Sequence, residues 1–529
     1  MSTKIDSNSL IKLAEIPPDT ELQADVCIVG SGPAGGILAV ELSKAGRSVI
    51  LLEAGGEKAA RDGDTLESVD VICEADLGLG RAFLLGGSSN LWAGRVAPLD
   101  PVDFDHREWV DEITWPLSHE SLLPYYRRSL NMIGIAETAL DADRSGGNAR
   151  FEKAFSEGLL APKPFVWSDP PFNIANYIAE EFPACAGRLR ILVDAPVDQL
   201  ESDSSGHVKA ALLKGPGKIC HRVEADQFVI AAGGLETPRL LLNSTDTHPA
   251  GLGNAHDLVG RYLSTHPKAN VAVLRLCRPS SPRNPLFSDH HVGDSLTRIG
   301  VALSRKFQTQ RNLLNHYVQF SPFSELQASR AFEMVKKREA FSSNFIDRSQ
   351  ISQRFLSGLG LWAFNRIGRV ARLQPLARTL MVRAFLDQYP DFDNRVSLSQ
   401  ATDARGMRKL DIFWRFSKRD RQSVLDFLEI LGRECRRSGI GNLNYDGLKG
   451  LEEWPLTAIH SHYLGTTRMS DDPTHGVVDP DCRVFGSPNL YVAGPSVFTT
   501  YGNANPFLTI SALSMRLAEH MLVSKPKSI

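Results

Sequence analysis

Residues 25–56 read DVCIVGSGPAGGILAVELSKAGRSVILLEAGG, and this stretch decides the fold. Its apolar run, 26–29, is too short for a helix and predicts a strand buried on both faces, as in a parallel sheet. The glycine-rich residues 30–35 predict a tight turn, followed by a helix that ends near Ala45 and is capped by Gly46. A second apolar run at 48–52 completes a strand, turn, helix, strand unit typical of an α/β fold.

The turn in this unit has the spacing of a dinucleotide-binding site. Gly30 allows the tight turn, Gly32 lets the backbone approach a pyrophosphate, and Gly35 lets the helix pack closely on the strand. Pro33 suits the first helical position. Glu53 ends the second strand, where a carboxylate accepts from ribose hydroxyls and disfavours a 2′-phosphate. The unit therefore predicts a bound dinucleotide and leaves its identity open.

The composition is that of an ordinary globular protein with more than one domain. The chain has 529 residues, 42% of them hydrophobic, and a formal net charge of −2, so nucleic acid is not expected as a partner. Its seven cysteines are scattered without a C-x-x-C pair, which predicts no metal site and favours a reducing, cytoplasmic location. The N-terminal residues show no export signal, and no apolar run is long enough to predict a transmembrane helix.

The rest of the chain predicts a dinucleotide-binding domain that a second domain interrupts. The loop at 86–94, GGSSNLWAG, suits close passage of the backbone past a flat ligand. Strand-like runs at 189–193 and 223–232 restore the α/β pattern, with a helix start expected at Thr237-Pro238. Runs at 270–276 and 395–415 predict a sheet in the second domain. The expected boundaries are 21–110, 189–265 and 455–525 for the first domain, and 111–188 and 266–454 for the second.

A basic segment lies within the second domain, near 330–385. Between residues 330 and 383 there are eleven basic side chains and three acidic ones, and phenylalanines and leucines interleave at helical spacing. Such a segment can be an amphipathic helix on an anionic membrane or an acidic partner. The composition favours a solvated helical cap over the substrate cavity, because a charge-rich helical face is usually solvated.

The last informative motifs are HSHYLGTTRM at 460–469, VVDP at 477–480, NLYVAG at 489–494 and GNANP at 502–506. Together with the opening unit, the 86–89 loop, AAGG at 231–234, ETPR at 236–239 and VGRYLSTHP at 259–267, they resemble the glucose-methanol-choline (GMC) oxidoreductases. Within that family the chain is most similar to the pyranose oxidase and gluconate or aminoglycoside dehydrogenase branch. Residues 280–387 carry little of the pattern, so the resemblance says little about the substrate.

The resemblance implies FAD as the dinucleotide, bound in a Rossmann-like domain that an α+β substrate domain interrupts. It places the catalytic histidine of the H-x-x-G-T-x-R-M motif at His462 and its partner at Asn505. Oxidising an alcohol requires loss of the hydroxyl proton and of a hydride, which the flavin accepts. His462 can take the proton, and the Asn505 amide can hold the substrate oxygen as negative charge develops. His460 is the competing assignment for the base, and His266 is expected to be structural or to support the site.

The resemblance also implies FAD contacts from several segments. The pyrophosphate turn, the end of the second strand, the flavin loop and the C-terminal motifs contribute Gly30, Gly32, Pro33, Ala34, Gly35, Glu53, Ala54, Gly86, Gly87, Ser88, Ser89, Asn90, Leu91, Trp92, Val197, Ala232, Gly233, Gly494, Asn505, Pro506 and Phe507. Val197 would meet the adenine through its backbone, and the Phe507 backbone N–H would lie near flavin O2. In pyranose and choline oxidases a flavin-bonded histidine occupies the position of Leu91; leucine cannot form that bond, so non-covalent FAD is expected.

The leading hypothesis is FAD-dependent oxidation of a hydroxyl on a sugar, glycoside, cyclitol or related alcohol. Oxygen, a quinone or a redox protein would accept the electrons. The first alternative is a lyase of the same family that keeps its flavin oxidised, since a lyase also needs a base. The second, motivated by the basic segment, is the flavin subunit of a membrane-associated electron-transfer complex.

Overall fold

The opening stretch forms the predicted unit in the computed structural model, which describes residues 10–18, 20–57, 69–73, 80–141, 149–214, 220–322, 376–457 and 462–523. Strand β2 (Leu22–Val29) runs into helix α1 (Pro33–Lys44), and strand β3 (Val49–Leu52) returns beside β2 in parallel. Pro33 opens the helix, and Gly46, at φ +101°, follows its end. The predicted strand, turn, helix and second strand are therefore confirmed.

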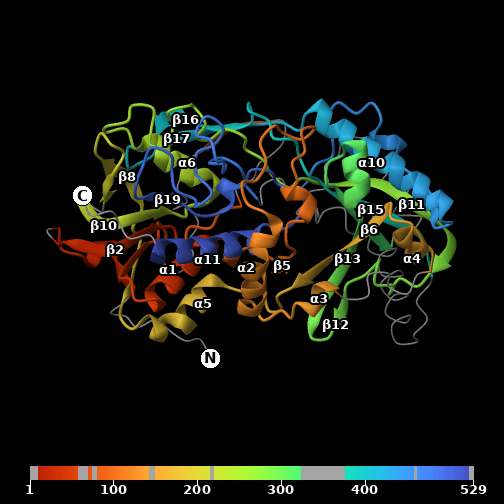
Figure 1. The fold of residues 1–529 in the computed structure, drawn as a ribbon, viewed down its shortest axis with the longest axis horizontal. Helices are drawn as coiled ribbons and strands as arrows, with labels where there is room; N and C mark the ends of the chain where they lie inside the picture. Colours follow the sequence, from red (N-terminus) through yellow and green to blue (C-terminus); the bar gives the residue numbers. More distant parts are fainter. Residues whose placement is uncertain are drawn as a thin grey trace, which may run out of the picture.

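Around this unit lies a mainly parallel sheet with the strand order β1-β7-β3-β2-β10-β9-β8, and β19 pairs with β10. Strand β7 (Leu189–Val193) has the predicted bounds, whereas β10 (Cys220–Ile230) begins and ends slightly earlier than the predicted 223–232. Strand β19 (Leu490–Val492) reaches the sheet from the C-terminal region, where helix α11 (Phe507–Val523) packs against α1 (Figure 1). Distant parts of the chain thus complete one sheet, as an interrupted domain requires.

Helix α6 (Gly233–Asn243) begins earlier than predicted. The expected start at Thr237-Pro238 is wrong, because Gly233, at φ +74°, turns the chain directly from β10 into the helix. Pro238 then lies inside the helix and has no N–H to donate to the Gly234 carbonyl. The Thr466 hydroxyl donates to that carbonyl at 2.7 Å instead. The buried Gly234 carbonyl therefore still has a hydrogen-bond donor.

A second, antiparallel sheet lies beside the first, on the right in Figure 1, and has the order β18-β11-β15-β14-β13-β6-β5. Its strands are β18 (Gly441–Asn444), β11 (Lys268–Ser280), β15 (Ala377–Phe385), β14 (Tyr317–Pro322), β13 (Ser295–Leu303), β6 (Leu160–Trp167) and β5 (Arg95–Val96), and β12 (His290–Val292) pairs with β13. The α/β fold with an α+β substrate domain is therefore confirmed.

Two predictions for the second domain need correction. Residues 377–385, placed at the end of the basic helical segment, form strand β15, since buried side chains alternate with exposed ones such as Arg378 and Arg383. The rest of that segment, 330–375, lies outside the described residues. Strands β16 (Arg395–Thr402) and β17 (Arg408–Trp414) do form, but they join β4 (Val69–Cys73) in a separate sheet.

The first sheet also contains β1 (Leu10–Lys12), β8 (Val197–Ser202) and β9 (Val208–Lys214). Further described helices surround the two sheets, namely α2 (His119–Met132), α3 (Thr138–Asp141), α4 (Ala149–Ser156), α5 (Ile174–Glu181), α7 (Arg305–Arg311) and α10 (Lys418–Arg437). Helix α2 packs on α11 and α5 packs on α1, so both cover the first domain although they lie within 111–188. The described helices include none that combines the length and apolar character needed to span a membrane.

Candidate active site

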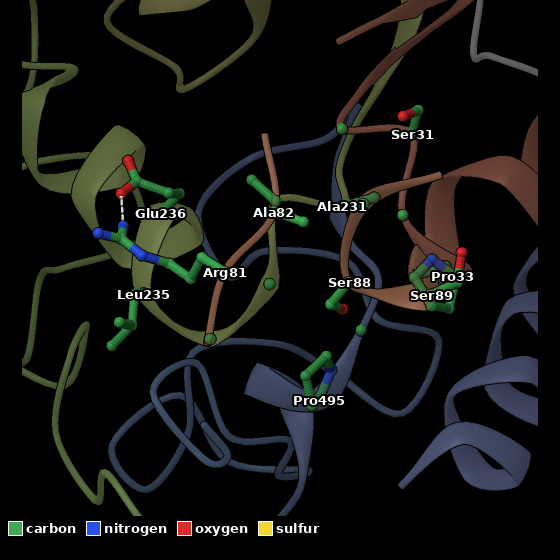
Figure 2. A pocket seen from close by; sticks show the side chains of 18 of the residues that line it. Ser31, Pro33, Arg81, Ala82, Ser88, Ser89, Ala231, Leu235, Glu236 and Pro495 are labelled. Carbon is green, nitrogen blue, oxygen red and sulfur yellow. Dashed lines mark hydrogen bonds and ion pairs between the residues drawn. The ribbon is translucent and has the colours of Figure 1, made fainter. Parts of the chain in front are cut away.

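A cavity of about 760 Å³ lies where the 30–34 turn, the 87–92 loop, the start of α6 and the start of α11 meet. Figure 2 shows Ser31 and Pro33 on one side of it and the ion-paired side chains of Arg81 and Glu236 on the other. Residues from the antiparallel sheet, including Lys268, complete the lining. The cavity therefore joins the dinucleotide-binding elements to the substrate sheet.

Both predicted catalytic residues, His462 and Asn505, line this cavity. So do most of the residues predicted to contact the cofactor, namely Gly30, Gly32, Pro33, Ala34, Glu53, Ala54, Gly87, Ser88, Ser89, Leu91, Trp92, Val197, Ala232, Gly233, Gly494, Pro506 and Phe507. Gly35, Gly86 and Asn90 are not among the residues that line the cavity. His460, the competing base, falls outside the described residues.

The glycines of the turn leave room for a phosphate group. A Cβ on Gly32 would meet no protein atom within 4 Å, and the Gly32 φ of −64° is accessible to any residue. Neither protein packing nor backbone conformation therefore requires glycine at this position. By contrast, a Cβ on Gly35 would lie 1.9 Å from the Gly30 carbonyl oxygen. The space in front of Gly32, at the N-terminus of α1, is the cradle that a pyrophosphate would fill.

A buried hydrogen-bond chain joins the two loops of the cradle. The Ser31 hydroxyl donates to Glu53 Oε2 at 2.5 Å and accepts from the Gly86 backbone N–H at 3.0 Å. Gly55 N–H donates to the other carboxylate oxygen at 2.9 Å. Burial raises the pKa of Glu53, although these donors act in the opposite direction. Glu53 thus fixes the turn as well as facing the cavity, and Asn90 holds the neighbouring loop through the Leu85 and Gly87 carbonyls.

A short antiparallel bridge sets His462 opposite His266. Ser264 and Leu464 exchange backbone hydrogen bonds of 3.1 and 3.0 Å, and two residues along each strand this register pairs positions 266 and 462. The two Nδ1 atoms are 3.1 Å apart, and the rings stand nearly perpendicular. A carbonyl oxygen, that of Tyr501, lies 3.0 Å from His266 Nε2.

These contacts determine which nitrogen of each ring carries the proton. The Tyr501 carbonyl only accepts, so His266 Nε2 must donate, and the neutral ring then accepts at Nδ1. His462 therefore donates from Nδ1, which leaves a lone pair on its Nε2. Burial lowers the pKa of His266 to about 4. Burial, with nearby His266 and Lys268, also holds the pKa of His462 well below 6.5, so both rings are neutral near pH 7.

The start of α11 brings Asn505 into the same cavity. Asn505 and Pro506 directly precede Phe507, the first residue of the helix, whose ring stacks on Trp92 with centroids 4.5 Å apart. The Trp92 indole donates to the Phe172 carbonyl at 2.7 Å, which fixes the ring. A helix N-terminus that faces a cavity favours negative charge on a ligand.

Several cavity residues were not predicted from the sequence. They are Arg81, Phe83, Arg95, Trp167, Leu235, Glu236, Lys268, Arg405, Met407 and Tyr463. The ETPR motif contains Glu236, but the motif does not predict the ion pairs that Glu236 forms with Arg81 and with the fully buried Arg239. Arg95 and Lys268 directly follow the motifs at 86–94 and 259–267 but are not part of them, and strands far apart in the sequence bring the two residues together.

Two family descriptions match the chain. Residues 390–514 match GMC oxidoreductase, and residues 25–291, half of the chain, match FAD dependent oxidoreductase. This chain belongs to the GMC oxidoreductase family. It is accordingly an FAD-dependent oxidoreductase that acts on CH–OH donors, and the resemblance inferred from the motifs is confirmed.

Some similar proteins match nearly the whole of this GMC oxidoreductase, and others match about half of it. A 6'''-hydroxyparomomycin C oxidase of Streptomyces lividus is 26% identical over 95% of this chain and 92% of its own. A C-glycoside 3-oxidase of Microbacterium trichothecenolyticum is 46% identical over 56% of this chain and 47% of its own. The crystal structure of pyridoxine 4-oxidase from Mesorbium loti shares the fold, with a TM-score of 0.57 and 20% identity over 94% of this chain and 98% of that one.

Proposed function

We propose that this GMC oxidoreductase oxidises a hydroxyl of a sugar, glycoside, cyclitol or related alcohol to a carbonyl, with His462 as the base. The observation that carries this proposal is the paired geometry of His266 and His462, which leaves an unprotonated Nε2 on a residue of the cavity wall. The similarity to a C-glycoside 3-oxidase and to a 6'''-hydroxyparomomycin C oxidase supports a sugar-like substrate.

FAD fits the residues present in the cavity. The turn at Gly30 and Gly32 would hold the pyrophosphate at the start of α1, Glu53 would face the ribose, and the 87–92 loop would border the ring. When bound, FAD supplies the acceptor for the hydride that leaves the carbinol carbon. Leu91 cannot form a bond to the ring, so we infer that the cofactor is held non-covalently.

The chain's own residues would manage the proton and the substrate oxygen. His462 Nε2 would accept the hydroxyl proton, and the resulting imidazolium would share its Nδ1–H with His266. The Asn505 side-chain amide would donate to the substrate oxygen as negative charge develops there. Because burial keeps the His462 ring neutral, the base form is already available at neutral pH.

An anaerobic screen tests this function. Neutral and acidic sugars, glycosides, cyclitols and simple alcohols are added to the oxidised holoprotein, and flavin absorbance and carbonyl product are measured together. At least one alcohol should bleach the flavin and give carbonyl in equal amount. Turnover with the flavin fully oxidised throughout would favour a lyase instead, and bleaching by no alcohol would contradict the proposal.

The electron acceptor is a separate question that the same preparation can answer. We infer that oxygen, a quinone or a redox protein accepts the electrons, and that the enzyme is cytoplasmic because its cysteines suit a reducing compartment. Admission of air to the reduced protein distinguishes the first acceptor from the others. Reoxidation within one turnover time identifies oxygen, and persistence of the reduced form until a quinone is added identifies a dehydrogenase.

A further inference from the structure

A ladder of three aromatic rings crosses the antiparallel sheet beneath the cavity. Phe385 on β15 stacks on Tyr317 of β14 with centroids 4.5 Å apart, and Tyr317 stacks on Phe165 of β6 at 4.7 Å. The intervening strand β13 contributes Gly300, where a Cβ would lie 2.7 Å from the Tyr317 ring. Because Gly300 has no side chain, the Tyr317 and Phe165 rings can stack across β13.

Cationic side chains lie over this ladder and face the cavity. The Arg95 guanidinium is 4.0 Å from the Phe165 centroid and 4.8 Å from that of Phe385, and Lys268 Nζ is 5.5 Å from the latter. Both residues line the cavity. Stacking on the rings holds the two cations in place, since cations are attracted to aromatic faces.

A third cation on the ladder differs from these two in having a counter-ion. Lys163, 5.9 Å from the Phe165 centroid, forms an ion pair with Asp100. Among the described residues, neither Arg95 nor Lys268 has a carboxylate within ion-pair distance. Arg95 donates to the Tyr317 hydroxyl at 2.9 Å, and its buried Nε has no hydrogen-bond partner in the described part of the chain.

The unpaired cations lie next to the proposed base. Lys268 follows His266 by two residues on the same chain segment, and its charge is among the groups that depress the pKa of His462. Burial lowers the pKa of Lys268, and Arg95 and the exposed Arg383 lower it further, so these positive charges are close enough to repel one another. Such clustering in a half-buried cavity is unfavourable until an anion neutralises it.

We propose that the alcohol oxidised by this enzyme carries an acidic group, a carboxylate or a phosphate, which binds between Lys268 and Arg95 beside His462. This inference rests on the proposed function and narrows its substrate class to acidic sugars and hydroxy acids. Arg95 suits either anion because a guanidinium offers a planar set of donors, and Lys268 adds a point charge.

Matched substrates and variants test the inference. Anaerobic flavin reduction is measured with an aldose, the corresponding uronic acid and the corresponding aldose phosphate, on wild type, Lys268→Gln, Lys268→Arg and Lys306→Gln. Lys306 is an exposed lysine outside the cavity and controls for net charge. Lys268→Gln should raise the half-saturating concentration of an acidic substrate about 10- to 100-fold, as expected for a lost charged hydrogen bond. The half-saturating concentration of the neutral aldose should rise by a clearly smaller factor than that of the acidic substrates, and Lys268→Arg should restore binding of the acids.

The three possible failures can be told apart. If no alcohol reduces the flavin, the proposed function itself fails. If the neutral aldose reduces it as well as both acids in wild type, only the acidic-substrate inference fails. If Lys268→Gln slows neutral and acidic substrates equally, Lys268 acts on the base or the cofactor and the inference is wrong. Preference for the uronic acid over the phosphate, or the reverse, identifies the anion.

The pH dependence gives an independent check on binding. A non-reactive carboxylate, benzoate, is titrated into the oxidised holoprotein while the flavin spectrum is recorded. Burial, with Arg95 and Arg383, lowers the pKa of Lys268 to about 8, so affinity should fall as pH rises through that value. The charged and titratable groups that face Lys268 are Arg95, Arg383, His266 and His462. Burial lowers the pKa of both histidines, so their rings are already neutral at pH 7 and do not contribute to a change between pH 7 and 9. Constant affinity across this range, or no spectral change at any pH, would contradict the inference.

Discussion

His462 depends on a second histidine for its expected basicity. Its Nδ1–H is committed to His266, which is itself fixed by the Tyr501 carbonyl, so the lone pair on Nε2 is a consequence of two hydrogen bonds outside the ring. Burial, with His266 and Lys268 nearby, keeps the pKa of the ring low. His266 is therefore a positioning residue, and its removal should alter which His462 nitrogen is protonated.

His266→Phe should slow flavin reduction about 10²-fold, because the wrong His462 tautomer would face the cavity and a misplaced group costs this much. His266→Asn keeps an acceptor at the position of Nδ1 and should recover much of the rate. Stopped-flow reduction at saturating alcohol separates this effect from binding. Equal loss in both variants would mean that His266 acts only through packing.

At the scale of elements, two glycines of the pyrophosphate turn have different roles: Gly35 allows close packing within the protein, and Gly32 leaves space for a ligand. Gly35 is needed by the protein itself, since a Cβ there would collide with the Gly30 carbonyl, whereas a Cβ on Gly32 would meet no protein atom within 4 Å. In α6, Pro238 has no N–H to donate to the Gly234 carbonyl. The hydroxyl of Thr466, which belongs to the catalytic motif, donates to that carbonyl instead. The glycines of the turn and Thr466 of the catalytic motif thus each have a physical reason for their place in the sequence.

Gly32→Ala should leave the fold of the apoprotein unchanged while weakening FAD binding about 10- to 100-fold, because the new methyl group would occupy the cradle. Gly35→Ala should destabilise the apoprotein as well, by about 1–3 kcal/mol, as overpacking does. Thermal unfolding of the apoproteins and fluorescence titration with FAD distinguish these effects. An unaltered FAD affinity in Gly32→Ala would place the pyrophosphate elsewhere.

Thr466→Val should cost about 1–3 kcal/mol of unfolding free energy, because it leaves the buried Gly234 carbonyl without a donor. In a Pro238→Ala background the new backbone N–H can donate to that carbonyl, so the same substitution should cost less. A double-mutant cycle by urea denaturation measures this coupling. Additive effects of the two substitutions would show that the hydroxyl does not compensate for the proline.

Local sequence patterns predicted those helices and strands that neighbouring residues alone determine. The apolar run and glycine spacing sufficed for β2, α1 and β3, and an apolar run sufficed for β7. They failed at the start of α6, where a proline suggested a first turn, and at β15, where basic residues obscured an alternating strand. The bridge that pairs Ser264 with Leu464 joins residues 200 positions apart and leaves no local signal.

At the scale of the whole molecule, the cavity exists because two sheets of different origin face it. The parallel sheet supplies the turn and the N-termini of α1 and α6, while the antiparallel sheet supplies Lys268, Trp167 and Arg95. The family motifs lie almost entirely on the first side and predicted His462 and Asn505 there. The cationic side of the cavity is formed by residues just outside the motifs, so the sequence predicted the reaction but not a preference for an acidic substrate.

The measurement that tests the central assignment most directly is anaerobic flavin reduction by His462→Ala, compared with His460→Ala and the exposed control His256→Ala. We expect His462→Ala to bind FAD normally and to lose at least about 10²-fold in the rate of bleaching, the contribution of a general base. His256→Ala should retain the wild-type rate. An undiminished rate in His462→Ala, or a comparable loss confined to His460→Ala, would contradict the assignment of His462 as the base.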